Sequence, residues 1–145
     1  LSDKDFRGKY MLVYFGFTHC PDICPTTLLI VQNALKDIGE KSSKISPIFI
    51  SLDPERDTPE IMGRYVGNFG EGLTGLTGTP AEIRQAADAY HVYYSKVEQP
   101  GSASGYLIDH SGFLYLMGPD GKYVAHFPHS ITEGELATKL NELVK

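Results

Sequence analysis

The run Tyr10-Met11-Leu12-Val13-Tyr14-Phe15 leads through Gly16 into the segment Cys20-Pro21-Asp22-Ile23-Cys24-Pro25. The first run carries no charge and is rich in aromatic and branched side chains, which predicts a buried β-strand over residues 9–15. After the cysteines, apolar residues recur at spacings of three and four, as on one face of a helix: Leu28, Val31, Leu35 and Ile38. This spacing predicts a helix from Thr26 to about Gly39, with Pro25 in its first turn.

The rest of the chain alternates between predicted strands and predicted helices. A second apolar strand is expected over residues 47–52, followed by a helix whose apolar residues are Ile61, Met62, Tyr65, Val66 and Phe69. Capping-box patterns at Thr79 and Thr132 predict the starts of two more helices. Further strands are expected over residues 92–95, 113–117 and 123–127, the last two as a hairpin, and a loop is expected over 98–104. This order predicts an α/β fold with a mixed sheet.

Composition excludes some classes of function. The chain has 145 residues, 41% of them hydrophobic, which suffices for one compact domain. Its net charge of -5 and the absence of a Lys/Arg cluster argue against binding to nucleic acid. No apolar run approaches the roughly 18 to 20 residues needed to cross a bilayer. Because the sequence begins at Leu1 rather than at Met, we expect the natural chain to continue upstream.

The only two cysteines, Cys20 and Cys24, lie four positions apart where a buried strand gives way to a helix. Such a pair can hold one soft metal ion or close one short disulfide, but it cannot join distant parts of a fold. At the start of a helix, the backbone N–H groups and the helix dipole lower a cysteine pKa from about 8.5, which favours the thiolate. Thiolates select Cu(I) or Zn over hard cations.

Two sulfurs leave a copper site incomplete, and an imidazole is the expected third ligand because copper accepts nitrogen in both oxidation states. Among the five histidines, we select His110, which ends a short apolar strand at a loop and is followed by Ser111. Asp109 beside it is a weak candidate for orienting the ring. A histidine in such a place is also often a plain surface residue, and His19, adjacent to Cys20, is a rival ligand. The others are expected at the surface: His91, His126 and His129.

The polar turn after the second strand begins with Asp53. If the two strands are parallel, this turn lies on the same edge of the sheet as the cysteines, so Asp53 can contribute near the site or serve the turn alone. For Arg56, Asp57 and Thr58 a structural role is expected, with Asp57 or Thr58 capping the next helix.

With these residues in view, the sequence resembles the Sco family, the assembly factors of cytochrome c oxidase, which have a thioredoxin-like fold. The matching blocks run through nearly the whole chain: residues 14–25, 53–58, 75–79, 90–94 and 109–111. The Cys-Pro-x-x-Cys-Pro element with a distant Asp-His pair is specific, because thioredoxins carry two residues between their cysteines. The segment 101–105 departs from the family pattern, because it lacks the acidic loop that some mitochondrial members have at this place. The partner contacts of those members are therefore not carried over to this chain.

The resemblance implies a single thioredoxin-like copper-binding domain over residues 1–145, with a central mixed β-sheet flanked by helices on both faces. It implies that one Cu(I) or Cu(II) is bound through Cys20, Cys24 and His110, and that Asp53 contributes near the site. It further implies a copper chaperone that assists assembly of the binuclear copper centre of cytochrome c oxidase subunit II.

The same resemblance implies a copper donor protein upstream in the pathway and an N-terminal membrane anchor ahead of Leu1. The implied location is the inner membrane facing the bacterial periplasm, with the mitochondrial intermembrane space as the alternative. We expect a monomer, because no apolar stripe is left over once each helix has covered the sheet.

A thiol-disulfide oxidoreductase that reduces the cysteines of that subunit is the alternative function. In that reaction Cys20 would attack a substrate disulfide and Cys24 would resolve the mixed disulfide, while His110 would be dispensable. A peroxidase is the weakest hypothesis, because it needs an arginine beside a reactive cysteine and only Arg56 is expected near the site.

Overall fold

The structure is a computed structural model that describes residues 8–16, 23–53, 57–67, 69, 73–90, 94–98, 106–110, 113–128 and 131–144, with the backbone alone for 23–26, 94–98 and 106–110. The strands are β1 (Tyr10–Gly16), β2 (Ile45–Ser51), β3 (Thr74–Leu76), β4 (Tyr94–Glu98), β5 (Tyr106–His110), β6 (Phe113–Met117) and β7 (Tyr123–Pro128). The helices are α1 (Ile23–Asp37), the 3-10 helix η2 (Gly39–Lys44), α2 (Pro59–Gly67), α3 (Pro80–Ala89) and α4 (Glu133–Leu143).

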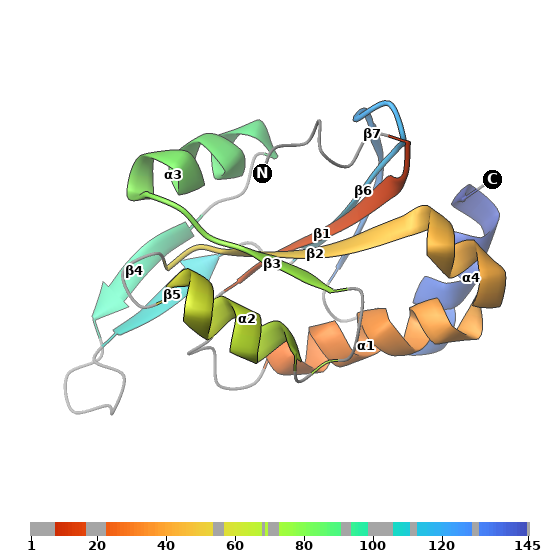
Figure 1. Cartoon of the computed structure of the whole chain (residues 1–145), viewed down its shortest axis with the longest axis horizontal. Coiled ribbons are helices and arrows are strands. Elements are labelled where there is room, and N and C mark those ends of the chain that lie inside the picture. Colours follow the sequence, from red (N-terminus) through yellow and green to blue (C-terminus); the bar gives the residue numbers. More distant parts are fainter. Residues whose placement is uncertain are drawn as a thin grey trace.

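A five-stranded mixed sheet in the order β3-β2-β1-β6-β7 forms the centre of the fold (Figure 1). Strands β1, β2 and β3 are parallel, and β6 and β7 are antiparallel to their neighbours. A separate two-stranded hairpin is formed by β4 and β5. Because the sequence β1-α1-β2 joins two parallel strands through a helix, both strands end at the same edge of the sheet.

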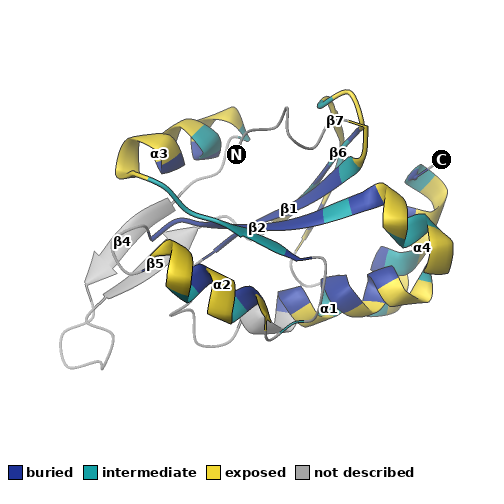
Figure 2. Ribbon diagram, in the orientation of Figure 1, coloured by how far each residue is buried: buried dark blue, intermediate teal, exposed yellow. Residues whose placement is uncertain are grey.

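The sheet is covered by helices on both faces, as the family resemblance implied. One core lies between the sheet and the helices α1, α2 and α4, and the second lies between the sheet and α3 (Figures 1 and 2). Alternate residues of β1 point into the two cores: Leu12 and Tyr14 into the first, Met11, Val13 and Phe15 into the second. Burial on both faces explains why this strand is a continuous apolar run.

The predicted apolar face of α1 and the predicted capping box at Thr79 are confirmed. Leu28, Val31 and Leu35 of α1 are buried, and Ile38 lies just past the helix and is half-buried. The Thr79 hydroxyl accepts the Glu82 N–H, and the Glu82 carboxylate accepts the Thr79 N–H in return, which completes the capping box.

At α4 the cap differs in detail from the prediction. The Thr132 hydroxyl accepts the Glu135 N–H but donates its own proton to the Glu135 carboxylate at 2.9 Å. Among the described residues, no helix is both long and apolar enough to span a bilayer.

Two elements were missed and several boundaries were misplaced; helix α1, for example, begins at Ile23 rather than at Thr26 and ends at Asp37 rather than at about Gly39. Neither the strand β3 nor the 3-10 helix η2 was predicted. Strand β3 is only three residues long and has Gly75 at its centre. Helix η2 is held by the Ser42 and Ser43 hydroxyls, which donate to carbonyls of η2 itself at 2.7 and 2.9 Å. Strand β2 begins at Ile45 rather than at residue 47. Strand β4 runs to Glu98, because its register is set by pairing with β5. The loop that was predicted to begin at residue 98 was therefore wrong at that position. Residues 99–104 lie outside the described chain.

Candidate metal and thiol centre

The two parallel strands β1 and β2 end side by side at one edge of the sheet. Gly16 pairs with Ser51, and the Leu52 N–H donates to the Gly16 carbonyl at 2.7 Å, which extends the pairing past the end of β2. The chain leaves β1 at this point toward the cysteine segment, and residues 17–22, including Cys20, lie outside the described residues. In an α/β sheet this carboxyl edge is where ligand sites form.

Cys24 is the second residue of α1, and the structure describes its backbone only. The first turn of a helix has backbone N–H groups without intrahelical partners and the positive end of the helix dipole. No acidic side chain lies in the first turn of α1. The first turn of a helix is a position that favours a cysteine thiolate, so a thiolate at Cys24 stays a prediction.

His110 is the last residue of β5, where it pairs with Tyr94 of β4. Strand β5 contacts β1 directly, and Figure 1 shows the β4–β5 hairpin at the end of the sheet where β1 and β2 end. The structure thus brings the backbones that carry Cys24 and His110 to the same edge of the sheet. The His110 side chain lies outside what is described.

Asp53 lies at this edge and is buried, with 2% of its surface exposed. Its N–H donates to the Ser51 hydroxyl at 3.0 Å, and the same hydroxyl donates to Asp57 Oδ2 at 2.6 Å. The Asp57 N–H in turn donates to the Asp53 carbonyl at 2.9 Å. The hydrogen bonds among these three buried residues fix the turn that follows β2, because buried polar groups are costly to leave unpaired.

The sequence predicted that Asp57 or Thr58 caps α2, and the structure shows that Thr58 is the cap. Thr58 Oγ1 accepts the Ile61 N–H at 3.3 Å at the start of α2, whereas Asp57 is fully buried and points back to Ser51. Arg56 lies outside the described residues. Sequence reasoning also missed Ser51. The available signal was a hydroxyl in an otherwise apolar strand, six residues ahead of a carboxylate.

Three aromatic rings hold the end of β1 in place. Phe15 packs edge-on against Tyr90 and Tyr115, with ring centroids 5.3 and 6.3 Å apart, and Tyr90 lies 5.7 Å from Tyr115. Burial, and to a lesser extent the nearby Tyr123 phenol, raises the pKa of Tyr115, so this ring stays neutral at physiological pH. Phe15, which directly precedes Gly16, is therefore fixed on the α3 side of the sheet.

The other histidines give no second candidate within the described chain. His126 is exposed on β7, as expected, and its Nδ1 bonds the Tyr123 hydroxyl. His19, His91 and His129 lie outside the described residues. Among the residues that are described, no three His, Cys, Asp or Glu side chains gather as a metal site.

Comparison with known proteins identifies the family. The family model described as SCO1/SenC matches residues 1–145. The human mitochondrial SCO1 homolog is 43% identical over 144 residues, which are 96% of this chain and 46% of that protein. The chain spans about half the length of such relatives. It covers 65% of the length of a Rickettsia prowazekii SCO2-like protein and 41% of the length of a mitochondrial Arabidopsis thaliana SCO1 homolog.

Solved structures agree with this assignment. The crystal structure of Arabidopsis thaliana ScoI with copper bound is 41% identical with a TM-score of 0.93, and the match covers 99% of this chain and 89% of that one. Bradyrhizobium japonicum ScoI with copper bound is 42% identical with a TM-score of 0.87, covering 99% and 90%. A more distant structure that shares the fold, 24% identical, is described as a member of the Sco family of cytochrome c oxidase assembly proteins. The chain belongs to the SCO1/SenC family and has its thioredoxin-like fold.

Proposed function

We propose that residues 1–145 form one copper-binding domain that carries a single Cu(I) or Cu(II) ion through Cys20, Cys24 and His110. The observation that supports this most is the meeting of α1, which begins next to Cys24, and of β5, which ends at His110, at the carboxyl edge of the sheet. Two thiolates and one imidazole are soft and borderline donors, which suit copper. Arabidopsis and Bradyrhizobium relatives have been solved with copper bound.

The proposed work of the domain is copper transfer. A three-coordinate ion lacks the closed shell of a structural site, so an incoming thiolate can bind before one of the chain's own ligands leaves. In this role Cys24 is a copper ligand at the start of a helix, and His110 is a copper ligand at the end of a strand. The sheet holds both of these elements in place. Asp53, with its buried turn, supports the edge from the side of β2.

The acceptor that we propose is subunit II of cytochrome c oxidase, whose binuclear copper centre the protein helps to assemble, and a separate donor protein supplies the copper. A Sco relative is described as a cytochrome c oxidase assembly protein, which supports this choice. We further propose that the natural protein is a monomer tethered by an upstream membrane anchor, in the periplasm or, alternatively, the mitochondrial intermembrane space.

Anaerobic Cu(I) titration against a competing chelator tests the proposed ligands. The parent protein should bind one equivalent, and Cys20→Ser, Cys24→Ser and His110→Ala should each weaken binding by at least about a hundredfold, since each removes one of three ligands. His126→Ala is the matched control, because His126 is exposed on β7 and its described side-chain contacts are with Tyr123 and Phe113. Equal binding by His110→Ala and the parent would remove His110 from the site.

A thiol-disulfide reductase is the second candidate, and the position of Cys24 in the first turn of α1 favours it. Electrons would pass from the two thiols to a disulfide of the acceptor, which becomes two thiols while Cys20 and Cys24 form a disulfide. The reduction of a disulfide peptide by the metal-free protein measures this activity. If reduction is fast and unaffected by His110→Ala while copper binding is weak, thiol exchange is the main function.

A further inference from the structure

A row of aromatic rings runs across the face of the sheet that α3 partly covers, from the end of β1 to the outer strand β7. Phe15 of β1 lies 5.3 Å from Tyr90 and 6.3 Å from Tyr115, measured between ring centroids, and the rings of Tyr90 and Tyr115 are 5.7 Å apart. Tyr115 of β6 pairs directly with His126 of β7, so their side chains are neighbours on this face. The His126 ring is in turn 6.0 Å from the Tyr123 ring. The row therefore connects the buried end of β1 with the outermost strand (Figure 1).

Tyr123 lies at the outer end of this row, in contact with both solvent and a proton acceptor. It exposes 57% of its surface, and it is the one exposed tyrosine among the side chains that the structure describes. Its hydroxyl is hydrogen-bonded to His126 Nδ1 at 2.5 Å. A neutral imidazole that carries its proton on Nε2 accepts such a bond at Nδ1. Phe113 packs edge-on against His126 with ring centroids 5.4 Å apart, which holds the imidazole in place beside the phenol.

Tyr115 differs from Tyr123 in how readily it releases its proton. Burial, and to a lesser extent the neighbouring Tyr123 phenol, raises the pKa of Tyr115 above its usual 10.0. A phenol that loses an electron becomes a strong acid, so a tyrosine is oxidised readily only where its proton can leave in the same step. His126 accepts that proton at Tyr123, whereas burial opposes its loss at Tyr115. We therefore expect an electron vacancy in the row to move to Tyr123.

We propose that Tyr123 and His126 form a proton-coupled redox site that draws oxidising equivalents away from the end of β1, where the chain leaves toward the two cysteines. In the first step the Tyr123 O–H bond breaks and the proton binds His126 Nδ1. The electron passes to a strong one-electron oxidant at the surface, or to an oxidised Tyr115 that has kept its own proton. The products are a neutral tyrosyl radical and an imidazolium.

A soluble enediol reductant of the ascorbate class restores the pair in the second step. It gives one electron to the tyrosyl radical and releases its own proton to water. The imidazolium of His126 returns its proton to the Tyr123 oxygen, so the phenol and the neutral imidazole are both formed again. The site thus consumes one oxidant and one reductant in each cycle and leaves the protein unchanged.

The redox site is independent of the proposed copper function, and metal-free protein is used to test it. Cys20→Ser/Cys24→Ser removes the thiols as competing electron donors. A laser flash on tris(bipyridine)ruthenium(II), with hexaammineruthenium(III) as the electron acceptor, generates the oxidant, and transient absorption and electron paramagnetic resonance measure the tyrosyl radical.

In this background, Tyr123→Phe should lose most of the radical signal. His126→Phe should form the radical at least about tenfold more slowly, because a positioned base accelerates proton transfer. Both positions are exposed, so these variants should fold with an unchanged melting temperature.

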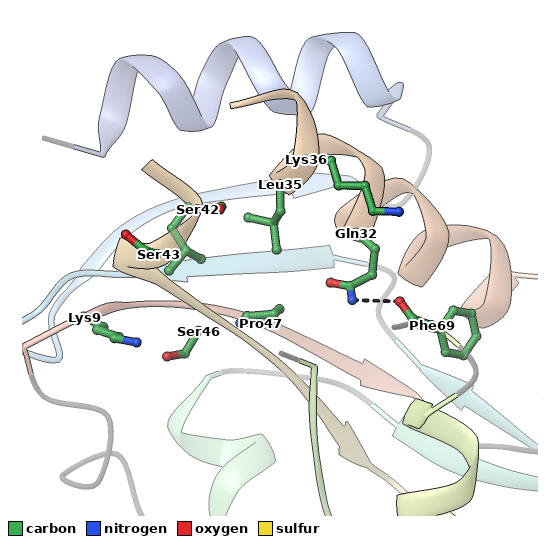
Figure 3. A pocket seen from close by; sticks show the side chains of 10 residues that line it. Lys9, Gln32, Leu35, Lys36, Ser42, Ser43, Ser46, Pro47 and Phe69 are labelled. Carbon is green, nitrogen blue, oxygen red and sulfur yellow. Dashed lines mark hydrogen bonds between the residues drawn. The ribbon is translucent and has the colours of Figure 1, made fainter. Parts of the chain in front are cut away.

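Tyr65→Phe is the matched control, because Tyr65 belongs to a row of aromatic rings in the other core. Its ring lies 5.6 Å from Phe49 and 5.3 Å from Phe69, and its hydroxyl oxygen is buried. The backbone of Phe69, at the end of that row, is held by a 2.8 Å hydrogen bond from Gln32 Nε2 to its carbonyl oxygen (Figure 3). Because this row lies on the opposite face of the sheet, Tyr65→Phe should keep the parent yield of radical and the parent rate of formation.

Three outcomes of this experiment contradict the proposal. A tyrosyl radical that keeps its parent yield in Tyr123→Phe would show that oxidation settles on another residue and would overturn the site. Equal losses of radical in Tyr123→Phe and Tyr65→Phe would overturn it as well. A rate of formation in His126→Phe equal to that of the parent would overturn the role of His126 as the proton acceptor.

A second measurement tests whether the row protects the cysteines. The reduced, metal-free protein with both cysteines present receives repeated flashes in the presence of ascorbate, and the free thiols that remain are titrated. Tyr123→Phe and Tyr115→Phe should each lose thiols faster than the parent, because the outward route for the electron vacancy is interrupted. Tyr65→Phe should lose them at the parent rate. Thiol loss at the same rate in Tyr123→Phe and in the parent would overturn the protective role.

Discussion

The Ser51 hydroxyl donates a 2.6 Å hydrogen bond to Asp57 Oδ2, and both side chains are fully buried. This contact joins the end of β2 to the residue two positions ahead of α2, and the Asp53 N–H adds a second bond to the same hydroxyl. The turn after β2 is therefore held by polar groups in a dry environment, where each bond has a larger effect than in water. It lies against Gly16, where the chain leaves β1 toward the cysteines.

Replacing this hydroxyl should destabilise the fold. Ser51→Ala removes the two hydrogen bonds that this buried hydroxyl makes, one to Asp57 Oδ2 and one from the Asp53 N–H, and losing hydrogen bonds between buried groups costs about 1–3 kcal/mol. We expect the free energy of unfolding, measured with urea, to fall by that amount. Ser43→Ala is the control, because its exposed hydroxyl donates to the Glu40 carbonyl within η2, and a loss below about 0.5 kcal/mol is expected. Equal losses in the two variants would contradict the importance of the buried contact.

Gly75 allows β3 to approach α2 closely. A Cβ at this position would lie 2.9 Å from Val66 Cγ1 and 3.3 Å from Met62 Cε, so one element must move. Gly75→Ala should lower the free energy of unfolding by about 1–3 kcal/mol, as overpacking does. Val66→Ala removes the closest atom, so the double variant should lose less than the sum of the two single losses.

Gly63→Ala is the matched control for Gly75→Ala. Gly63 lies inside α2, and a Cβ there meets no atom within 4 Å. Because alanine is the better helix former, this variant should gain up to about 1 kcal/mol. If urea unfolding showed the two alanine variants to be equally stable, the close approach at Gly75 would not limit the fold.

Glu82 makes the start of α3 sensitive to acid. The Thr79 backbone N–H and hydroxyl, both bonded to this carboxylate, hold the pKa of Glu82 below its usual 4.5. A lowered pKa in the folded state means that the contribution of the charge is complete above pH 4.5 and is lost as the pH falls through the folded-state pKa. In Glu82→Gln the cap geometry can persist without the charge. The stability difference between the parent and Glu82→Gln should therefore shrink between pH 7 and pH 3, whereas a constant difference would show that the charge has no role.

The sequence was informative wherever burial alone decides the structure. The run from Tyr10 to Phe15 predicted a strand buried on both faces, because all its side chains enter one of the two cores. The apolar face of α1 and the capping box at Thr79 likewise depend on residues within four positions of one another, so the sequence shows them directly.

Features that depend on distant partners were not predicted. Nothing around Asp57 distinguishes an N-cap from a buried carboxylate until β2 places Ser51 beside it. Strand β3 exists because Ile48 and Ile50 offer it a parallel edge, and the register of β4 is set by β5. The grouping of Cys24 and His110 at one edge followed from the resemblance and from parallel strands, while the contact of β5 with β1 needed the structure.

The most direct test of the proposed centre is X-ray absorption spectroscopy at the copper edge of the Cu(I)-loaded protein. We predict a three-coordinate ion with two sulfur ligands and one imidazole nitrogen. The imidazole signal should disappear in His110→Ala and persist in His19→Ala. A site with no imidazole in the parent protein, or an imidazole signal that is lost in His19→Ala and kept in His110→Ala, would contradict the assignment of Cys20, Cys24 and His110 as the copper ligands.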